Sequence, residues 1–358
     1  MGNYSRSLIE SLARFFPENK YLLYTPKATV NEATRPLLQG GNIAAKVPTV
    51  TLWGTIWRTF LTGQLKKDGI ALYHGLSHEL PLGIEKSGIK SVVTIHDLIF
   101  IRYPHYYPLL DRIIYQKKCL SACRRADAII AISQQTKRDI VAYLDIPEDK
   151  IKVVYQTCHP VFERKANPEA LEAVREKYRL PGKYILNVGT IEERKNILTL
   201  VKTLPLLPAD VAIVAVGKRT RHATTIEEWL AKNSLQDRVM FLHDVPFQDL
   251  PAIYQNAAVF AYPSEFEGFG IPVIEALKSG VPVVAASGSC LEEAGGHATV
   301  YAAHHDVAAW ARAINSILAN AQQQESMKEE GLRYAAKFSE ENHARETMQV
   351  YTDLLSQS

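Results

Sequence analysis

The sequence SEFEGFGIPVIEAL at residues 264–277 decides the fold of the C-terminal half of the chain. It follows an apolar, β-branched run that predicts a strand over Val259–Tyr262. Pro272 marks the start of a helix, because a missing N–H costs nothing in the first turn. Gly268 and Gly270 let the main chain approach a ligand closely, and the open N–H groups of a helix start attract an anion. The stretch therefore predicts a strand–loop–helix turn of a parallel α/β sheet.

Two glutamates in this stretch, Glu267 and Glu275, are candidates for binding hydroxyl groups. We expect Glu267 in the loop and Glu275 two turns into the helix. A carboxylate accepts two hydrogen bonds from vicinal hydroxyls, which suits a sugar or a ribose. An ordinary glycine-rich turn with two solvated glutamates is the structural alternative, and the spacing alone leaves it open.

A second segment, NVGTIEERKN at residues 187–196, repeats the pattern of a strand followed by a glycine turn. Gly189 ends the strand, and Arg194 and Lys195 precede a helix expected over Ile197–Leu204. The planar fork of arginine and the point charge of lysine both suit a diphosphate. An exposed, solvated basic pair is the alternative interpretation.

Short apolar runs alternate with longer amphipathic stretches along the whole chain, which is typical of repeated βα units. The expected strands fall into two series: Tyr21–Tyr24, Ile70–Tyr73, Ser91–Ile95, Ala128–Ile132 and Ile151–Val154, then Tyr184–Val188, Val211–Val216, Val239–Phe241, Val259–Tyr262 and Pro282–Ala285. An amphipathic helix, Pro168–Tyr178, lies between the series. We expect domains at residues 1–160 and 161–338, joined at residues 159–181 and able to rotate about that connection. Residues 339–358 should form a last helix that packs back toward the first domain.

The chain begins with a predicted helix from about Asn3 rather than with a strand. Parallel α/β domains normally begin with a strand whose C-terminal end leads into a glycine-rich turn. Met1–Tyr4 looks like the end of such a turn. We therefore expect that the first strand is missing and that the natural protein begins upstream of Met1.

Composition excludes several classes of protein. Hydrophobic residues make up 47% and charged residues 22% of the 358 residues, which argues against disorder. No apolar run reaches the roughly 18 residues that span a bilayer, and the N-terminus has no apolar signal core. Four scattered cysteines form no disulfide framework and no zinc motif. These features predict a cytoplasmic protein.

Charge is unevenly distributed. Residues 1–160 carry a net charge of +8 and residues 161–358 a net charge of −5, within a total of +3. A basic N-terminal half suggests an anionic partner on that side, such as the inner face of a membrane or a phosphorylated acceptor. Uneven solvated charge without a partner is an equal alternative, and nucleic acid is not an expected partner.

Together these motifs resemble the group 1 glycosyltransferases of the GT-B superfamily, the retaining enzymes of family 4, over nearly the whole chain. The pair Glu267 and Glu275 matches the family's two glutamates, and Gly189 with Arg194, Lys195 and Asn196 matches its phosphate motif. Further matches are Thr94–Asp97 around the family's active-site histidine, Ala131–Ser133 with Thr136, Gly280–Ala285 with Ser287, and Glu292–Gly295.

The resemblance implies an α/β GT-B fold, with two Rossmann-like parallel-sheet domains facing a central cleft. It also implies roles for single residues. Lys195, with Arg194 as the second candidate, neutralises the donor diphosphate. Glu275 holds the ribose hydroxyls and Glu267 faces the transferred sugar or its phosphate. His96 lines the sugar pocket from the first domain and comes toward Glu267 as the domains close.

The same resemblance implies a donor-binding surface and the substrates. Gly2 belongs to the loop that closes over the diphosphate, and the remaining donor-binding residues are Gly189, Thr190, Asn196, Gly268, Phe269, Gly270 and Ile271. Thr190 stands where many relatives carry arginine. The donor is a nucleoside diphosphate sugar, GDP- or UDP-linked, and the acceptor is a glycan or a lipid-linked glycan. No metal and no separate cofactor are expected, and bacterial surface-polysaccharide mannosyltransferases are the expected nearest relatives.

Three alternatives remain beside this interpretation. A dinucleotide-binding oxidoreductase needs G-x-G-x-x-G between strand and helix, whereas Gly268-Phe269-Gly270 lacks the third glycine and is followed by Pro272. A nucleotide-sugar epimerase on the same fold is the enzymatic alternative. An inactive, truncated remnant that acts as a binding partner is the third.

Two features of the first half stay ambiguous. His74, at the end of an expected strand, either faces a sugar or is structural. The aromatic-rich segment Arg102–Tyr107 either stacks on a sugar acceptor or forms a packed surface loop.

Overall fold

The computed structural model describes residues 2–25, 41–48 and 57–356 of the chain. The chain divides into two compact units. Unit 1 comprises Met1–Gln156 together with Glu340–Ser358, and unit 2 comprises Thr157–Ser339. Among the described residues, no helix is long and apolar enough to cross a membrane.

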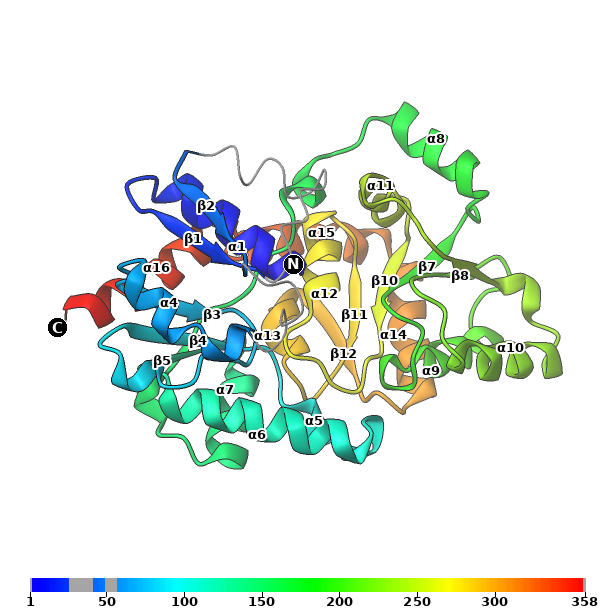
Figure 1. Ribbon diagram of the computed structural model, residues 1–358. Coiled ribbons are helices and arrows are strands. Elements are labelled where there is room, and N and C mark those ends of the chain that lie inside the picture. Colours follow the sequence, from blue (N-terminus) through cyan, green and yellow to red (C-terminus); the bar gives the residue numbers. More distant parts are fainter. Residues whose placement is uncertain (1, 26–40, 49–56, 357–358) are drawn as a thin grey trace. The chain divides into compact units, whose positions relative to one another are not determined.

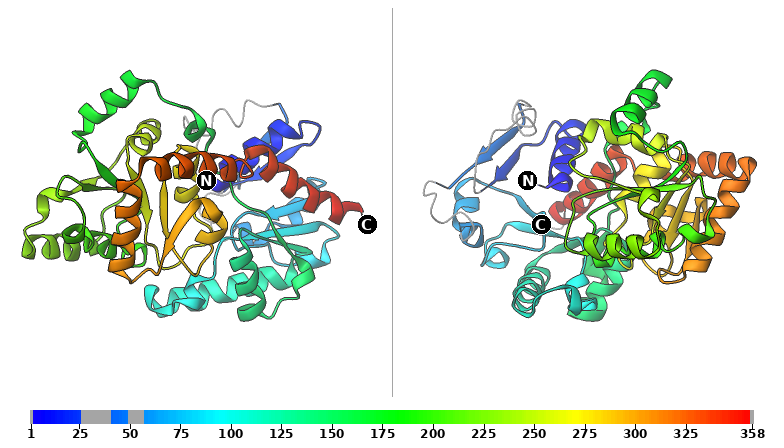
Figure 2. Two further views of the ribbon diagram at one scale, coloured as in Figure 1. Left: turned by 180° about the vertical axis from the view of Figure 1, so that it is seen from behind. Right: turned by 90° about the vertical axis from the view of Figure 1, so that its right-hand side faces the viewer.

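Unit 2 is built on one parallel sheet of six strands in the order β12-β11-β10-β7-β8-β9 (Figures 1 and 2). Since β7 is the first strand of this unit, the order matches the 3-2-1-4-5-6 arrangement of doubly wound nucleotide-binding sheets. The strands are β7 (Tyr184–Val188), β8 (Ala212–Val216), β9 (Val239–Leu242), β10 (Val259–Tyr262), β11 (Val283–Ala286) and β12 (Thr299–Ala302). Strand order reverses between β7 and β10.

Helices cover this sheet, which explains why the inner strands β8, β10 and β11 are apolar at every position, whereas β7 contains one polar residue, Asn187. All residues of β8, β10 and β11 are buried. The helices of unit 2 are α8 (Pro168–Tyr178), α9 (Ile197–Val201), α10 (His222–Lys232), α11 (Leu250–Gln255), α12 (Ile271–Lys278), α13 (Leu291–Gly295), α14 (Val307–Ala319) and α15 (Ala321–Ala335). Of these, α12 packs on β10 and β11.

Unit 1 contains two separate parallel sheets in its described part. One pairs β1 (Tyr21–Tyr24) with β2 (Ile43–Lys46). The other has the order β3-β4-β5-β6, formed by β3 (Leu72–Gly75), β4 (Lys90–Ile95), β5 (Ala128–Ala131) and β6 (Ile151–Val153). The expected strand before Met1 stays a prediction.

The helices of unit 1 bury apolar stripes against these sheets and against each other. In the part of unit 1 that the structure describes, they are α1 (Asn3–Phe15), α4 (Thr62–Lys67), α5 (Ile99–Arg102), α6 (Leu109–Arg125), α7 (Gln134–Leu144) and α16 (Glu340–Ser356). Leu8 and Leu12 of α1 pack against Ala344 of α16. An apolar contact between α1 and α16 thus joins the two chain segments that make up unit 1.

The predicted α/β class with two parallel-sheet domains is confirmed, although some element limits differ from the prediction. The first part of Ile70–Tyr73 is not a strand, because the N–H of Ile70 donates to the carbonyl of Leu65 and Gly69 adopts a φ of 66°. This is a glycine-centred helix cap. β3 therefore begins only at Leu72.

Two strands and one helix end were predicted wrongly. β2 and β12 were not expected, since β2 reads IAAK, two of whose four residues are alanines of low strand preference, and both strands are short. The helix expected over Ile197–Leu204 ends at Val201. Pro205 disfavours helical geometry at Leu204, the residue before it, and a 3-10 turn, Leu204–Leu206, follows instead.

Candidate active site

The two motif segments meet at the carboxyl ends of β7 and β10, where the strand order of unit 2 reverses. Ligands of doubly wound sheets bind at such switch points, because the connections diverge to opposite faces and leave the strand ends open. The backbone pairing between these strands covers Val259 with Ile185 and Phe260 with Leu186. One residue further along, the buried Asn187 amide donates to the Ala261 carbonyl over 2.8 Å. A side-chain hydrogen bond thus joins the two strand ends beyond the last backbone pair of the two strands.

The turn after β7 requires glycine at two neighbouring positions. A Cβ atom on Gly217, at the end of β8, would lie 1.9 Å from the carbonyl oxygen of Gly189. Gly189 itself has a φ of 152°, and the methylene groups of Lys195 pack at 3.8 Å from where its Cβ would be. The close approach of the two strand ends therefore excludes any side chain at Gly217, whereas at Gly189 the φ favours glycine, because 3.8 Å is an ordinary contact.

Asn196 fixes this turn to two other loops. It adopts a left-handed conformation with a φ of 54°. Its amide nitrogen donates to the carbonyls of Pro263 and His304, at 3.2 and 2.6 Å, and its oxygen accepts from Thr199 over 2.8 Å. Since all polar atoms of its side chain are engaged, Asn196 supports the predicted donor-binding surface through the loops that it ties together.

The loop after β10 turns into α12 through Gly270, whose φ is 130°. A Cβ atom at Gly270 would lie 2.8 Å from Leu291 and 3.2 Å from Ala294, so α13 packs directly on this glycine. Phe269 is buried, with its ring edge-on to Phe338 at 5.4 Å. The side chain of Phe269 is therefore not available to a ligand. The remaining predicted positions of the two loops, Thr190, Gly268 and Ile271, are half-buried.

Glu267 lies at the centre of a charged cluster. Lys195 Nζ forms an ion pair with Glu267 Oε1, and Arg194 Nη1 lies 3.1 Å from Oε2. The hydroxyls of Ser264 and Tyr262 donate to Oε1 over 2.6 and 3.1 Å. Burial alone would raise the pKa of Glu267, but the two cations and these hydrogen bonds outweigh it and lower that pKa to about 2.

The two cations of the cluster differ in how many bonds hold them. Arg194 pairs with Glu192 over 2.8 Å and donates to the carbonyl of Phe266, in addition to its contact with Glu267. Lys195 Nζ donates to Tyr262 over 2.8 Å and to Glu267. An ammonium group has three N–H donors, so Lys195 keeps one for a ligand. The geometry favours Lys195 over Arg194 as the group that meets a phosphate oxygen.

Glu275 lies on α12, as the sequence predicted, but only about one turn beyond the helix start at Ile271 rather than two. Its Oε2 accepts a hydrogen bond from Tyr254 over 2.8 Å. Burial raises the pKa of Glu275 to about 7, although the Tyr254 hydrogen bond opposes the shift. The two glutamates therefore have opposite pKa shifts, because Glu267 lies between two cations and the hydroxyl of Tyr254 only partly offsets the burial of Glu275.

His96 follows β4 in unit 1 and is held by a set of neutral partners. Its Nε2 lies 2.9 Å from the carbonyl of Leu76, and Gln156 lies 3.1 Å from its Nδ1. With Nε2–H donating to the carbonyl, Nδ1 accepts from the Gln156 amide. The backbone N–H of His96 donates to His78 over 2.8 Å, and the Tyr4 ring stands edge-on at 4.7 Å. Burial lowers the pKa of His96, so its ring is neutral.

His74 is part of a buried hydrogen-bond network in the same unit. Its ring nitrogens lie 2.6 Å from the hydroxyl of Tyr351 and 2.8 Å from that of Thr94. Tyr4 also reaches Thr94, at 3.0 Å. Burial lowers the pKa of His74 to about 3. With both nitrogens engaged by α16 and β4, the structural interpretation of His74 is the one that the geometry supports.

One other position, Gly2, completes the predicted set. Gly2 caps the N-terminus of α1, and its carbonyl accepts from the backbone N–H of Arg6 over 3.2 Å. No Cβ clash would arise at Gly2. Within the described part of the chain, no group of His, Cys, Asp and Glu side chains converges as metal ligands would.

Sequence reasoning missed four residues that touch the predicted ones: Tyr254, Tyr262, Ser264 and Gln156. Tyr262 and Ser264 were within reach, because they end β10 and begin its loop at the switch point. Tyr254 and Gln156 approach from α11 and from the segment after β6. Nothing in the local pattern at these two positions signals a contact with a distant carboxylate or imidazole.

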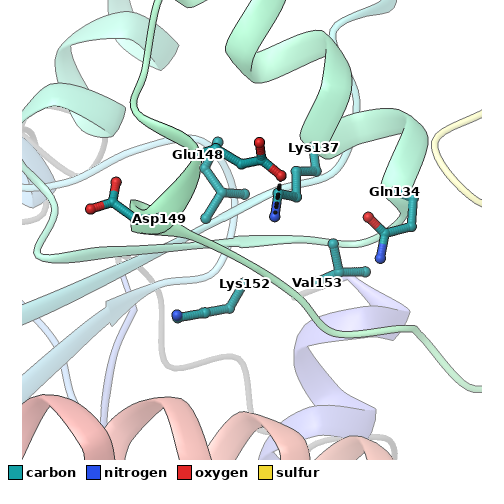
Figure 3. A pocket seen from close by; sticks show the side chains of 7 residues that line it. Gln134, Lys137, Glu148, Asp149, Lys152 and Val153 are labelled. Carbon is teal, nitrogen blue, oxygen red and sulfur yellow. Dashed lines mark ion pairs between the residues drawn. The ribbon is translucent and has the colours of Figure 1, made fainter.

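A pocket of unit 1 lies elsewhere and contains none of these residues. It is lined by Gln134, Lys137, Glu148, Asp149, Ile151, Lys152 and Val153, next to the start of α7 and β6 (Figure 3). Lys137 pairs with Glu148 over 3.0 Å. The pocket is open and polar, and we assign it no role in the chemistry.

Comparison with known proteins agrees with the geometry. Residues 172–334 match the family model of the glycosyl transferases group 1, and residues 9–158 match that of glycosyltransferase family 4. The O-antigen chain mannosyltransferase B of Escherichia coli is 32% identical over 78% of this chain and 74% of its own length. The serotype-specific mannosyltransferase WbdA of Escherichia coli is 29% identical over 81% of this chain, which spans 37% of that larger protein.

A solved structure gives the same fold. The Anabaena protein HepE, in complex with UDP and glucose, superposes with a TM-score of 0.76 over 99% of this chain and 96% of its own, at 18% identity. At this identity the likeness concerns the fold alone.

Proposed function

The chain belongs to the group 1, family 4 glycosyltransferases, and from this premise we propose that it transfers a sugar with retention from a nucleoside diphosphate sugar to a glycan or lipid-linked acceptor. We propose cell-surface polysaccharide synthesis as its setting and mannose as the sugar, because the relatives at 29–32% identity are named O-antigen and serotype-specific mannosyltransferases. The donor nucleotide is GDP or UDP, and HepE, a neighbour in fold, holds UDP.

The charged cluster at the switch point carries this proposal. When the bond between the sugar and the donor phosphate breaks, its electron pair stays on the diphosphate, whose negative charge grows. A cation fixed beside the breaking bond stabilises that charge more in the transition state than in the ground state. Lys195 fits this role, because Glu267 and Tyr262 orient its ammonium group and leave one N–H open.

Glu267 is suited to binding rather than to proton donation. With a pKa of about 2 it stays ionised at neutral pH. An ionised carboxylate accepts hydrogen bonds from sugar hydroxyls and favours positive charge on the sugar as the bond breaks. Glu275 lies on α12, the helix that starts from the same loop. We assign to Glu275 the binding of the ribose hydroxyls of the donor.

The role of His96 in lining the sugar pocket stays a prediction that rests on the family resemblance. Its neutral ring suits a hydrogen bond with an uncharged sugar hydroxyl better than a contact with the diphosphate. Because both ring nitrogens already have partners, a sugar hydroxyl would replace either the Leu76 carbonyl or the Gln156 amide.

A thermal-shift screen with GDP, UDP and ADP tests the proposal. A ligand at a hundred times its Kd stabilises the native state by about 2.7 kcal/mol. We expect GDP or UDP to raise Tm clearly in the wild type and much less in Glu275→Ala. A shift with an oxidised nicotinamide dinucleotide and with none of the nucleoside diphosphates would overturn the proposal in favour of an oxidoreductase. The epimerase and remnant alternatives have no observation in their favour.

A further inference from the structure

Two kinds of contact hold the imidazole ring of His96, and a ligand would affect them differently. The ring nitrogens lie 2.9 Å from the Leu76 carbonyl and 3.1 Å from the Gln156 amide. A sugar hydroxyl that binds the imidazole would replace one of these hydrogen bonds and leave a single one. The ring of Tyr4, edge-on with its centroid 4.7 Å away, leaves both nitrogens to their hydrogen bonds. The Tyr4 contact can therefore restrain the imidazole both with and without a ligand.

The hydroxyl group of Tyr4 fixes the Tyr4 ring in turn. Tyr4 lies in the first turn of α1, and its hydroxyl is 3.0 Å from Oγ1 of Thr94. Thr94 belongs to β4, the strand that leads into His96. Burial raises the pKa of Tyr4 to about 12, so the hydroxyl keeps its proton at neutral pH. This bond thus ties the Tyr4 ring to the strand end that carries the imidazole.

Thr94 is also part of a chain of hydrogen bonds that ends on α16. His74 Nε2 lies 2.8 Å from Thr94 Oγ1, and His74 Nδ1 lies 2.6 Å from the hydroxyl of Tyr351. The His74 ring is neutral, so one nitrogen donates and the other accepts. Whichever nitrogen carries the proton, each bond from Tyr4 to Tyr351 can have one donor and one acceptor. Hydrogen bonds in such a buried chain strengthen one another.

A second residue of α16 contacts the Tyr4 ring directly. The ring centroid of His343 lies 5.7 Å from that of Tyr4. In the described part of the chain, neither ring nitrogen of His343 has a hydrogen-bond partner, so this contact is one of packing alone. The helices α1 and α16 lie side by side in unit 1 (Figures 1 and 2). The last helix therefore supports Tyr4 both by packing and through the hydrogen-bond chain.

We propose that Tyr4 is a positioning residue for His96, and that Thr94, His74 and Tyr351 hold Tyr4 in the required orientation. The gain for sugar transfer rests on the proposed function, because it depends on the role of His96 in the sugar pocket. A hydrogen bond to a sugar hydroxyl is directional, and a misplacement of about 1 Å can lower a rate by about 100-fold. The contact with Tyr4 keeps the imidazole in place when a sugar hydroxyl displaces one of its partners.

NMR of the histidine side chains tests the contact without any substrate. Long-range proton–nitrogen spectra report the tautomer and the surroundings of each imidazole, and His96→Ala identifies the His96 signals by their absence. Tyr4→Leu removes the aromatic ring current beside His96 and frees its ring, so the His96 signals should shift and broaden. Tyr351→Phe interrupts the chain at its far end, so it should shift the His74 signals strongly and the His96 signals less.

Tyr21→Phe is the matched control in the same unit. The Tyr21 hydroxyl donates to the carbonyls of Leu12 and Phe16, each over 3.0 Å, and neither bond belongs to the chain. This variant should lower Tm but leave the His96 signals unchanged. A loss of stability alone is thereby separated from a loss of positioning.

Steady-state kinetics with GDP-mannose and a mannose-terminated glycan test the consequence for transfer. Tyr4→Leu should lower kcat by about 10–100-fold with a smaller change in the KM for the donor. Tyr4→Phe keeps the ring and should have a smaller effect, and Tyr21→Phe should keep the wild-type kcat. Added to His96→Ala, Tyr4→Leu should cause no further loss, because it acts through the imidazole that it positions.

Two results would overturn the proposal: unchanged His96 signals in Tyr4→Leu, or a loss of kcat that adds in full to the loss in His96→Ala. If Tyr4→Leu does not fold, Tyr4→Phe and Tyr351→Phe provide the same spectral test. Normal transfer by His96→Ala would remove His96 from the proposed function. In that case the His96 signals in the Tyr4 variants still decide whether Tyr4 orients the imidazole.

Discussion

Lys195 and Glu267 are separated by 72 residues in the sequence, and their charged groups form a direct ion pair at the switch point of unit 2. The pair joins the loop after β7 to the loop after β10. It holds the ammonium group of Lys195 in one orientation before any ligand arrives. A preorganised cation of this kind needs no reorientation as charge develops on a leaving group.

Lys195→Ala should lower turnover by at least about 100-fold, because loss of one preorganised transition-state contact has effects of this size. The measurement is the steady-state rate of nucleoside diphosphate release. Lys202→Ala, which removes an exposed lysine shortly after the same segment, is the control and should leave the rate unchanged. A near-normal rate in Lys195→Ala would remove Lys195 from the mechanism.

Glu275→Ala should weaken nucleotide binding by about 1.5–3 kcal/mol, the usual contribution of hydrogen bonds to a charged group. Titration calorimetry with the matching nucleoside diphosphate measures this. Glu172→Ala removes an exposed carboxylate of the same unit and serves as the control. Equal affinities in the wild type and Glu275→Ala would place the ribose elsewhere.

The raised pKa of Glu275 makes the stability of the ligand-free protein depend on pH. Its pKa is about 7 in the folded chain against an ordinary 4.5, so the native state binds the proton more tightly than the unfolded state. The resulting stabilisation is complete below about pH 4.5 and is lost as pH rises toward 7. Glu275→Gln, which is always neutral, should therefore gain Tm relative to the wild type across this range. If the difference in Tm between Glu275→Gln and the wild type did not change with pH, the raised pKa of Glu275 would be contradicted.

Gly270→Ala should lower the free energy of unfolding by about 1–3 kcal/mol, the cost of holding a side chain in a strained backbone conformation. The new methyl group would also meet Leu291 at 2.8 Å. Denaturant unfolding of unliganded protein gives the measurement. Gly182→Ala, at a position with ordinary φ and no neighbour within 4 Å, is the control and should be neutral. Equal stability of the two variants would show that the packing of α13 on the loop is not tight.

The sequence predicted the sheets well, because most strands are apolar runs bounded by turn residues. The strand limits of β7 and β10 were predicted to the residue. β2 and β12 were not predicted, because their short runs do not alternate between apolar and polar residues. The end of α9 was predicted wrongly because it depends on Pro205. The prediction placed Gly189, Lys195, Glu267 and Glu275 on elements whose ends meet in one sheet.

What the sequence did not predict depends on contacts between distant residues. The ion pair of Glu267 with Lys195, and the hydrogen bond of Tyr254 with Glu275, join segments that only the sheet order brings together. The opposite pKa shifts of the two glutamates follow from those partners and from burial, and neither is encoded in the local spacing.

The most direct test of the central claim is a transfer reaction with GDP-mannose and UDP-linked sugars as donors and a mannose-terminated glycan as acceptor. The account predicts that nucleoside diphosphate is released in step with product. It also predicts that proton NMR of the product finds the sugar with the anomeric configuration of the donor, and that Lys195→Ala abolishes both signals. Product with the inverted configuration would contradict retention, and donor consumption without transfer to any acceptor would contradict the account as a whole.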